Sequence, residues 1–221
     1  MATLDLHRDH GWSPRQSRSR RTLERLTDAG EALFAERGYD GASVSDIVAR
    51  ANCSVGAFYA RFKDKESLFL HIHDRHCRLL IARIDFLCDL FRAENAPLEV
   101  MVRQSVRALF LFAGQRRALT RVFIQRSGMD AGFHARYARI WGEVRDRLRP
   151  AMLARRGEIA HAEPERAVDF TLQLMHGLWA NDVLHHRMAQ ITGQATGEAL
   201  VEDLTDACLA HLGARAAARP R

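Results

Sequence analysis

Apolar residues recur along this chain at helical spacing, and the clearest run lies between residues 133 and 152. Its apolar members, mostly three or four residues apart, are Phe133, Tyr137, Ile140, Trp141, Val144, Leu148 and Met152. This period places them on one face of a helix. No segment shows sustained alternation between apolar and polar residues bounded by turn signals, which is the pattern of a half-buried strand. The pattern therefore predicts an all-α fold.

Further helices are expected on both sides of this run. The first has Leu26, Gly30 and Leu33 on one face and stops at Gly38, a residue suited to a helix C-terminus. Proline favours the first turn of a helix, so Pro97 and Pro164 are predicted starts. The expected helices cover 16–37, 44–51, 55–61, 65–92, 97–112, 116–125, 133–152, 164–187 and 198–212.

The predicted helix over 164–187 is apolar on two sides of its axis. The first stripe comprises Val168, Leu172, Met175 and Trp179, and the second comprises Phe170, Leu174, Gly177, Leu178 and Asn181. A helix of this kind must be covered on both faces. It is either a central helix of a monomer core or a helix with one face against a second molecule. Segment 198–212 repeats the pattern more weakly. Leu204 and Cys208 are predicted to join the second stripe in a contact with a second molecule.

The segment 43–68, with the sequence SVSDIVARANCSVGAFYARFKDKESL, predicts two short helices joined by a tight turn. Ser43 is a suitable N-cap for a helix over 44–51. Asn52 tolerates the left-handed conformation that often follows a helix, and Ser54 can cap the second helix. Two helices joined by about three residues cannot lie side by side. They are expected to cross steeply, as in a helix-turn-helix.

The second of these helices has one face with little bulk. Val55, Gly56 and Ala57 are small, whereas Phe58 and Phe62 supply bulk on the opposite face. A slim, weakly apolar face makes a poor core surface, but it fits a DNA major groove, which is about 12 Å wide. Tyr59, Arg61, Lys63 and Lys65 add donors and positive charge where phosphates would lie. The alternative is a helical hairpin whose lysines are only solvated.

Composition changes this picture little. The apolar fraction is 47%, and the formal charge of +6 with a pI near 9.7 is compatible with nucleic acid without requiring it. The arginines at 15, 18, 20 and 21 belong to a basic arm that either reaches DNA or is solvated. No long uncharged apolar stretch and no secretory signal is evident. We therefore expect a cytoplasmic protein with no membrane partner, and the four scattered cysteines are expected to be structural thiols.

Segment 43–68 resembles the TetR/AcrR family of transcriptional regulators. The residues that match the family signature are Ser43, Ile47, Ala51, Ser54, Gly56, Phe58, Tyr59, Phe62, Lys65, Glu66 and Leu68. The preceding residues 32–39, ALFAERGY, are similar to the family's first helix and its exit. Val48, Asn52 and Cys53 stand where the family usually has Ala, Gly and Val. The resemblance covers about residues 20–70.

The resemblance implies a function for each part of the chain. It implies phosphate contacts from Ser43, Tyr59 and Lys65. It implies positions near base edges for Val55, Gly56, Ala57 and Arg61. Ser54 and Lys63 complete the expected DNA-binding set. The implied protein is a homodimeric repressor that a small-molecule effector releases from a palindromic, double-stranded operator. An activator and an effector-independent regulator are the alternatives. The expected parts are a flexible arm (1–15), a DNA-binding domain (16–64), an effector-binding and dimerisation domain (65–212) and a disordered tail (213–221).

The sequence also contains residues that could support other chemistry. The candidate effector contacts, which fit an ordinary core equally well, are Phe112, Phe123, Trp141, Met175, His176 and Trp179. Metal sensing would use His71, His73, His76 and Cys77, and redox sensing would use Cys53. No second cluster of metal ligands stands out, so no metal or cofactor is expected. The chain has no GxSxG, P-loop or HExxH motif and its acids are dispersed, which argues against a helical enzyme.

Overall fold

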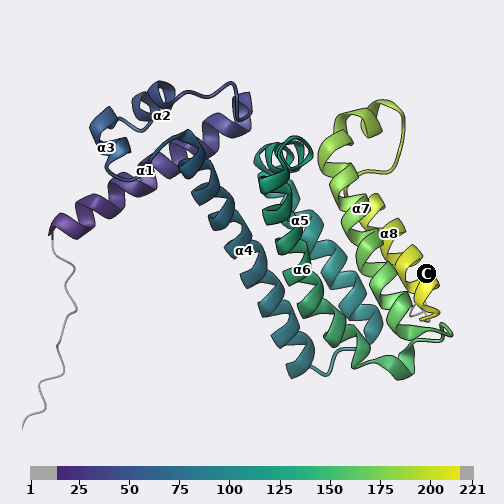
Figure 1. Ribbon diagram of the computed structural model, residues 1–221. Coiled ribbons are helices and arrows are strands. Elements are labelled where there is room, and N and C mark those ends of the chain that lie inside the picture. The colour runs from purple at the N-terminus through teal and green to yellow at the C-terminus, as the bar shows by residue number, and fades with distance from the viewer. Residues whose placement is uncertain (1–13, 215–221) are drawn as a thin grey trace, which may run out of the picture. The chain divides into compact units, whose positions relative to one another are not determined.

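The computed structural model describes residues 14–214, and these residues are helical with no strand among them (Figure 1). The elements are α1 (Pro14–Arg37), α2 (Val44–Arg50), α3 (Val55–Tyr59), α4 (Lys65–Ala93), α5 (Leu98–Met129), α6 (Ala131–Leu153), the short 3-10 helix η1 (Arg156–Glu158), α7 (Pro164–Ile191) and α8 (Gly197–Leu212). The predicted all-α class is confirmed. None of the described helices is long and apolar enough to cross a membrane.

The chain divides into two compact units, residues 1–72 (unit 1) and residues 73–221 (unit 2). The division falls inside α4, whereas the sequence prediction began its second domain at Lys65. Most of the predicted arm and most of the predicted tail lie outside the described residues. Pro14 and Arg15 already belong to α1, and Gly213 caps α8 in the left-handed conformation, with φ of 65°.

Unit 1 encloses a core formed by α1, α2, α3 and the start of α4. Leu26, Phe34, Ile47, Phe58 and Leu68 are fully buried there, as their apolar spacing predicts. Gly30 lets α1 pack closely on α4, because a Cβ at this position would lie only 2.9 Å from Leu68 Cδ2. The core therefore fixes the short helices α2 and α3 from behind.

In unit 2, helix α5 packs against α6, α7 and α8, which run beside it (Figure 1). The sequence predicted separate helices over 97–112 and 116–125, and the structure confirms an interruption between them. Within α5, two helical segments meet at a kink at Arg116, where φ is −133° and ψ is 24°. The helix continues because Leu119, Val122 and Phe123 are buried and keep their packing beyond the kink.

The two stripes of α7 have different environments in the described chain. The first stripe, from Val168 to Trp179, is buried in the core of unit 2. The second stripe faces outward, and Phe170 is 48% exposed. Leu204 and Cys208 do not share that outward face, since they are 2% and 0% exposed and pack within unit 2. The exposed positions of α8 are Gly197, Glu198, Ala199, Glu202, Asp203, Asp206, Ala207 and Ala210.

Candidate functional site

The turn between α2 and α3 has the local geometry that the sequence predicts. The Ser43 hydroxyl accepts a hydrogen bond from Asp46 N at 3.1 Å, and Asp46 accepts from Ser43 N at 3.1 Å, which completes a capping box. Asn52 adopts φ of 49° after α2. Ser54 Oγ accepts from Ala57 N at 3.1 Å and begins α3. These bonds make α2 and α3 a compact helix-turn-helix.

Helix α3 presents a slim, exposed face. It spans Val55–Tyr59, two residues shorter than predicted, because the chain leaves the helix at Ala60. Val55 is 50% exposed and Tyr59 is 56% exposed, whereas Phe58 is fully buried. A Cβ added at Gly56 would meet no atom nearer than Ser54 Oγ, at 3.9 Å. The surface of α3 is therefore open to a partner.

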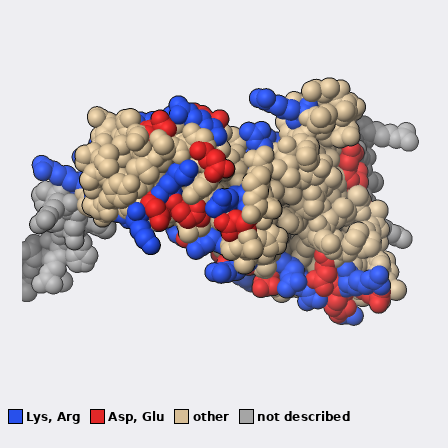
Figure 2. Space-filling view, turned by 45° about the horizontal axis from the view of Figure 1, so that its top comes forward, with Lys and Arg blue, Asp and Glu red and all other residues tan. Residues whose placement is uncertain are grey.

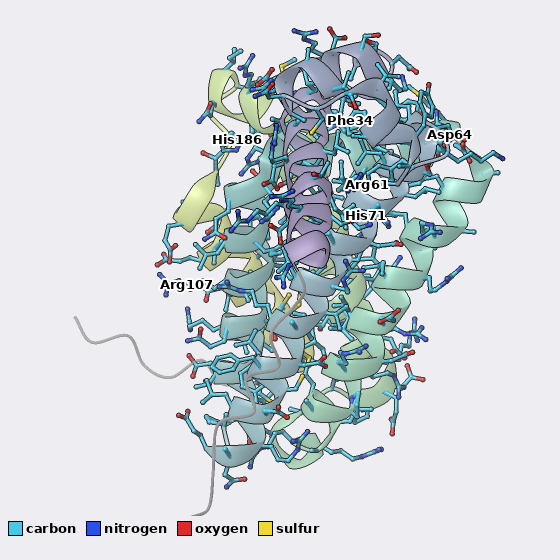
Figure 3. The ribbon with its side chains drawn as sticks, turned by 90° about the vertical axis from the view of Figure 1, so that its left-hand side faces the viewer. Phe34, Arg61, Asp64, His71, Arg107 and His186 are labelled. Atoms are coloured by element: carbon cyan, nitrogen blue, oxygen red, sulfur yellow. The ribbon has the colours of Figure 1, made fainter. Side chains whose placement is uncertain are left out.

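Two basic residues assigned to DNA contacts are engaged within unit 1. Arg61 lies against α1 (Figure 3), where its guanidinium donates to Ser19 Oγ at 3.1 Å and to Ala57 O at 2.9 Å. Lys65 donates to Tyr39 O at 2.9 Å and to Ala42 O at 3.0 Å. Lys63 is exposed. In this arrangement Arg61 points back toward α1 and Lys65 toward the α1–α2 connection.

The hydroxyl of Ser43 is also occupied locally. Its O–H donates to Asp46 Oδ2 at 2.6 Å, and this bond, with the backbone bond from Ser43, holds the pKa of Asp46 below its ordinary value. Ser54 uses its oxygen as an acceptor, so its O–H can still donate to a phosphate. Tyr59 lies with its ring against Phe58 at 5.3 Å between centroids. Ser54 and Tyr59 are thus the better placed donors.

Sequence reasoning missed the role of Arg25. Its guanidinium donates to the carbonyls of Ala51 and Asn52 and so ties α1 to the turn of the helix-turn-helix. A second tie joins α1 to α2, where Arg50 forms two hydrogen bonds to Glu36, of 2.6 and 2.7 Å. The only sequence signal for these ties was the surplus of arginine. Charge on the face shown in Figure 2 is mixed, with Lys and Arg interleaved with Asp and Glu over the described residues.

A cavity of about 460 Å³ lies in unit 2 between α6 and α7, with Leu109 of α5 at its floor. Three of the predicted effector contacts, Trp141, Met175 and His176, line it. The rings of Trp141 and His176 lie 4.0 Å apart between centroids. Burial lowers the pKa of His176, so this imidazole is uncharged near neutral pH. The cavity combines apolar walls with a polar rim.

The other three predicted contacts lie in the protein core. Trp179 is buried behind Trp141 at 4.8 Å, and its indole N–H donates to Leu109 O at 3.1 Å. Phe112 and Phe123 instead flank His76, at 4.7 and 5.2 Å between ring centroids. The helical spacing of Phe112, Phe123 and Trp179 predicts that they face the interior, but spacing cannot distinguish a cavity wall from a packed core.

The candidate metal and redox residues have separate surroundings. His73 contacts Cys77, with 3.4 Å between Nε2 and Sγ, while the ring of His71 packs on Phe62 at 5.5 Å. Over residues 14–214 no group of three or more His, Cys, Asp or Glu is arranged to hold a metal ion. Burial raises the pKa of Cys77 and of Cys208 to about 12, which keeps both as thiols. Cys53 donates to Ala51 O at 3.4 Å in the turn.

Comparison with known proteins associates unit 1 with a family. A family model described as bacterial regulatory proteins, tetR family, matches residues 26–72. The A-factor receptor protein of Streptomyces griseus is 27% identical over 117 residues, which are 50% of this chain and 39% of that protein. The transcriptional repressor BepR of Brucella suis is 33% identical over 96 residues, 43% of this chain and 45% of that protein. The chain therefore spans less than half the length of these curated relatives.

Solved structures share the fold over most of the chain. A candidate TetR-family transcriptional regulator from Mesorhizobium loti is 25% identical, with a TM-score of 0.65 over 89% of this chain and 97% of that one. A bacterial regulatory protein in the tetR family from Rhodococcus is 19% identical, with a TM-score of 0.66 over 88% and 98% of the two chains. These similarities extend through unit 2, which begins after the last residue that the family model matches.

Proposed function

Because the chain belongs to the TetR family of transcriptional regulators, we propose that it is a homodimeric repressor that a small molecule releases from a palindromic DNA operator. Regulators of this family are not enzymes, so the working parts of the molecule are surfaces and a cavity. Since its proposed partner is DNA, we expect the protein to act in the cytoplasm.

The observation that carries the proposal is the exposed, small-residue face of α3. Gly56 and its neighbours leave room for the backbone of α3 to approach base edges, and the carbons of Val55 and Ala57 suit contact with thymine methyl groups. Ser54 and Tyr59 supply hydroxyls for phosphates at the two ends of the helix. The ties from Arg25 and Arg61 support this role by holding the turn and α3 against α1. Lys65 holds the start of α4 to the connection between α1 and α2.

Dimerisation is supported by the outward stripe of α7. Phe170, Leu174 and Leu178 leave apolar surface on this helix, and Gly177 between them leaves room for a second backbone. An isologous contact through α7 and α8 pairs two copies about a two-fold axis. Two copies present two α3 helices, as the two halves of a palindrome require.

Release by an effector is supported by the cavity between α6 and α7. A ligand that binds one arrangement of unit 2 better than another shifts the population of that arrangement and with it the affinity for DNA. The cavity volume of about 460 Å³ falls in the range of roughly 300–1,000 Å³ typical of small-molecule sites.

The experiment that tests DNA recognition uses two matched glycine variants. Gly56 and Gly128 both lie in exposed helix positions with space for a side chain. We expect Gly56→Leu to weaken binding to duplex DNA from the region flanking the chain's own gene by at least tenfold, because the new side chain occupies the space for a base edge. Gly128→Leu is expected to bind like the unaltered protein. The measurement is a gel-shift titration at low salt, with thermal unfolding to verify that both variants fold.

The proposal fails if the unaltered protein ignores that duplex at low salt, or if Gly56→Leu binds it as tightly as Gly128→Leu does. A reporter gene behind the bound sequence then tests the sign of regulation. Repression is expected, and expression that rises with the protein contradicts it.

A further inference from the structure

We propose that the cavity between α6 and α7 takes a flat aromatic molecule that carries one anionic group, an aromatic carboxylate. This inference rests on the proposed effector-binding role of unit 2. The floor is apolar and is formed by Leu109, Val144, Leu148, Leu172 and Met175. Such a floor favours a hydrocarbon body over a polar one, since buried polar groups on a ligand would find no partners there.

One wall of the cavity is aromatic. Trp141 lines it, with His176 beside the indole at 4.0 Å and an interplanar angle of 38°. His176 Nε2 lies 3.4 Å from the hydroxyl of Tyr137, which holds the imidazole in place. Because burial lowers the pKa of His176, the wall carries no charge near neutral pH. A flat ring can pack against this wall by offset or edge contacts.

The charge at the rim is asymmetric. Arg145 and Asp169 are the charged residues that line the cavity. Both oxygens of Asp169 are bonded to Arg149, at 2.7 and 3.2 Å, and this pairing lowers the pKa of the carboxyl group. Arg145 makes a long contact of 3.5 Å with Asp146, and both side chains are exposed. Its charge also contributes to the lowered pKa of Asp169, but no hydrogen bond between Arg145 and Asp169 is present among the described residues. Since a guanidinium has five N–H donors, Arg145 retains donors for a ligand carboxylate.

Gly142, in the middle of α6, leaves space along the lining of the cavity. Gly142 lines the cavity although glycine is unfavourable inside a helix. A Cβ at this position would meet no atom within 4 Å. A larger side chain therefore fits without displacing protein atoms and takes up space that the ligand would use. Gly142→Leu is accordingly a blocking variant.

Calorimetric titration of the full chain with three related probes tests the proposal. The probes are 2-naphthoate, 2-naphthylmethanol and 2-naphthylmethylammonium, which share one ring system and differ in charge. We expect saturable binding of the carboxylate, at least tenfold tighter than the alcohol or the ammonium. Arg145→Gln should weaken the carboxylate at least tenfold and leave the alcohol unchanged. Arg139→Gln, an exposed arginine of the same helix that lines a different groove, should change neither.

Several results would overturn the proposal. They are equal affinity for the three probes, no binding of any probe, an unchanged carboxylate affinity in Arg145→Gln, and full binding in a folded Gly142→Leu. The comparison of probes needs no variant, so it stands even if Gly142→Leu fails to fold. Operator binding is measured separately by gel shift. If the protein binds DNA but not 2-naphthoate, only the proposed ligand class is wrong. If it binds 2-naphthoate but no DNA, the proposed repressor function is wrong.

Discussion

Lys65 has two proposed roles, one in DNA binding and one in the stability of unit 1. Its ammonium donates to Tyr39 O and Ala42 O and lies 4.3 Å from the centroid of the Tyr39 ring, and its third N–H can still reach a phosphate. We expect Lys65→Met to weaken binding to all DNA sequences and to lower the free energy of unfolding by about 1–3 kcal/mol, since it removes a charged donor from two carbonyls. Chemical denaturation and fluorescence anisotropy measure the two effects.

Lys63 is the matched control for this prediction. It is exposed and near the same helix start. Lys63→Met is expected to reduce the salt dependence of DNA binding by about one phosphate contact and to leave unfolding unchanged. If Lys65→Met unfolds like the unaltered protein, the two carbonyl contacts of Lys65 do not stabilise unit 1.

Arg61 provides a second residue-scale prediction. Its bonds to Ser19 join α3 to α1 across 42 residues of sequence. We expect Arg61→Ala and Ser19→Ala to be non-additive in denaturation, with a coupling of about 0.5–3 kcal/mol, because each variant removes the same contact. Base preference should be unchanged in Arg61→Ala. Additive losses together with an altered base preference would place Arg61 at the bases instead.

These residues also show what a sequence can predict at this scale. Ser43, Asn52 and Ser54 were predicted correctly as caps and turn residues, because their roles depend on neighbours within three positions. The side chains of Arg25, Arg61 and Lys65 instead form hydrogen bonds with residues 23 to 42 positions away in the sequence. A long, flexible side chain follows its tertiary surroundings, so the fold had to be known first.

At the scale of elements, α4 carries two buried histidines that make unit 2 sensitive to acid. Burial is the main cause that lowers the pKa of His73 to about 4 and of His76 to about 3. The neighbouring charges of Arg136 and Arg116 act in the same direction, while Asp74 opposes them at His73. Both histidines are therefore neutral in the folded protein at pH values where those of the unfolded chain become protonated.

The two histidines make the folded protein less stable in acid. As the pH falls below about 6.5, the unfolded chain binds protons that the folded chain does not, so the free energy of unfolding decreases, by up to about 1.4 kcal/mol per pH unit for each histidine. Denaturation at pH 7.5, 6.5, 5.5 and 5 measures this slope. We expect His76→Gln to flatten it and the exposed His185→Gln to leave it unchanged. Equal slopes for the two variants would contradict the assignment.

The prediction of helices succeeded where the apolar spacing continues over many residues. It failed to predict which apolar faces point into the protein's own core. The 28 residues of α7 carry two stripes whose spacing identifies both faces. The apolar stripe of α8 has the same spacing, yet spacing cannot state whether Leu204 and Cys208 face their own core or a partner. The interruption predicted between the helices over 97–112 and 116–125 corresponds to the kink at Arg116 in α5. The spacing could not state that the chain continues there without a loop, because the burial of Leu119, Val122 and Phe123 beyond the kink depends on tertiary contacts.

At the scale of the whole molecule, the proposed dimer makes DNA binding depend on one face of α7. Gly177 lies on this face and, like Gly128 on α5, is an exposed helical glycine with space for a side chain in the protomer. We expect Gly177→Arg to remain folded but to elute as a monomer in size-exclusion chromatography with light scattering, because a charged side chain would have to be buried in the interface. Gly128→Arg should remain dimeric.

The same pair of variants connects assembly to operator affinity. A monomer binds one half-site. In a dimer, binding of one α3 helix holds the second at a high effective concentration near its own half-site, which increases the affinity for the full palindrome by a factor of about 100 to 10,000. Gly177→Arg is therefore expected to lose at least a hundredfold in affinity for the full palindrome and little for an isolated half-site. If Gly177→Arg remains dimeric and binds the full palindrome as Gly128→Arg does, the second stripe of α7 is not the dimer interface and another surface must align the two DNA-reading helices.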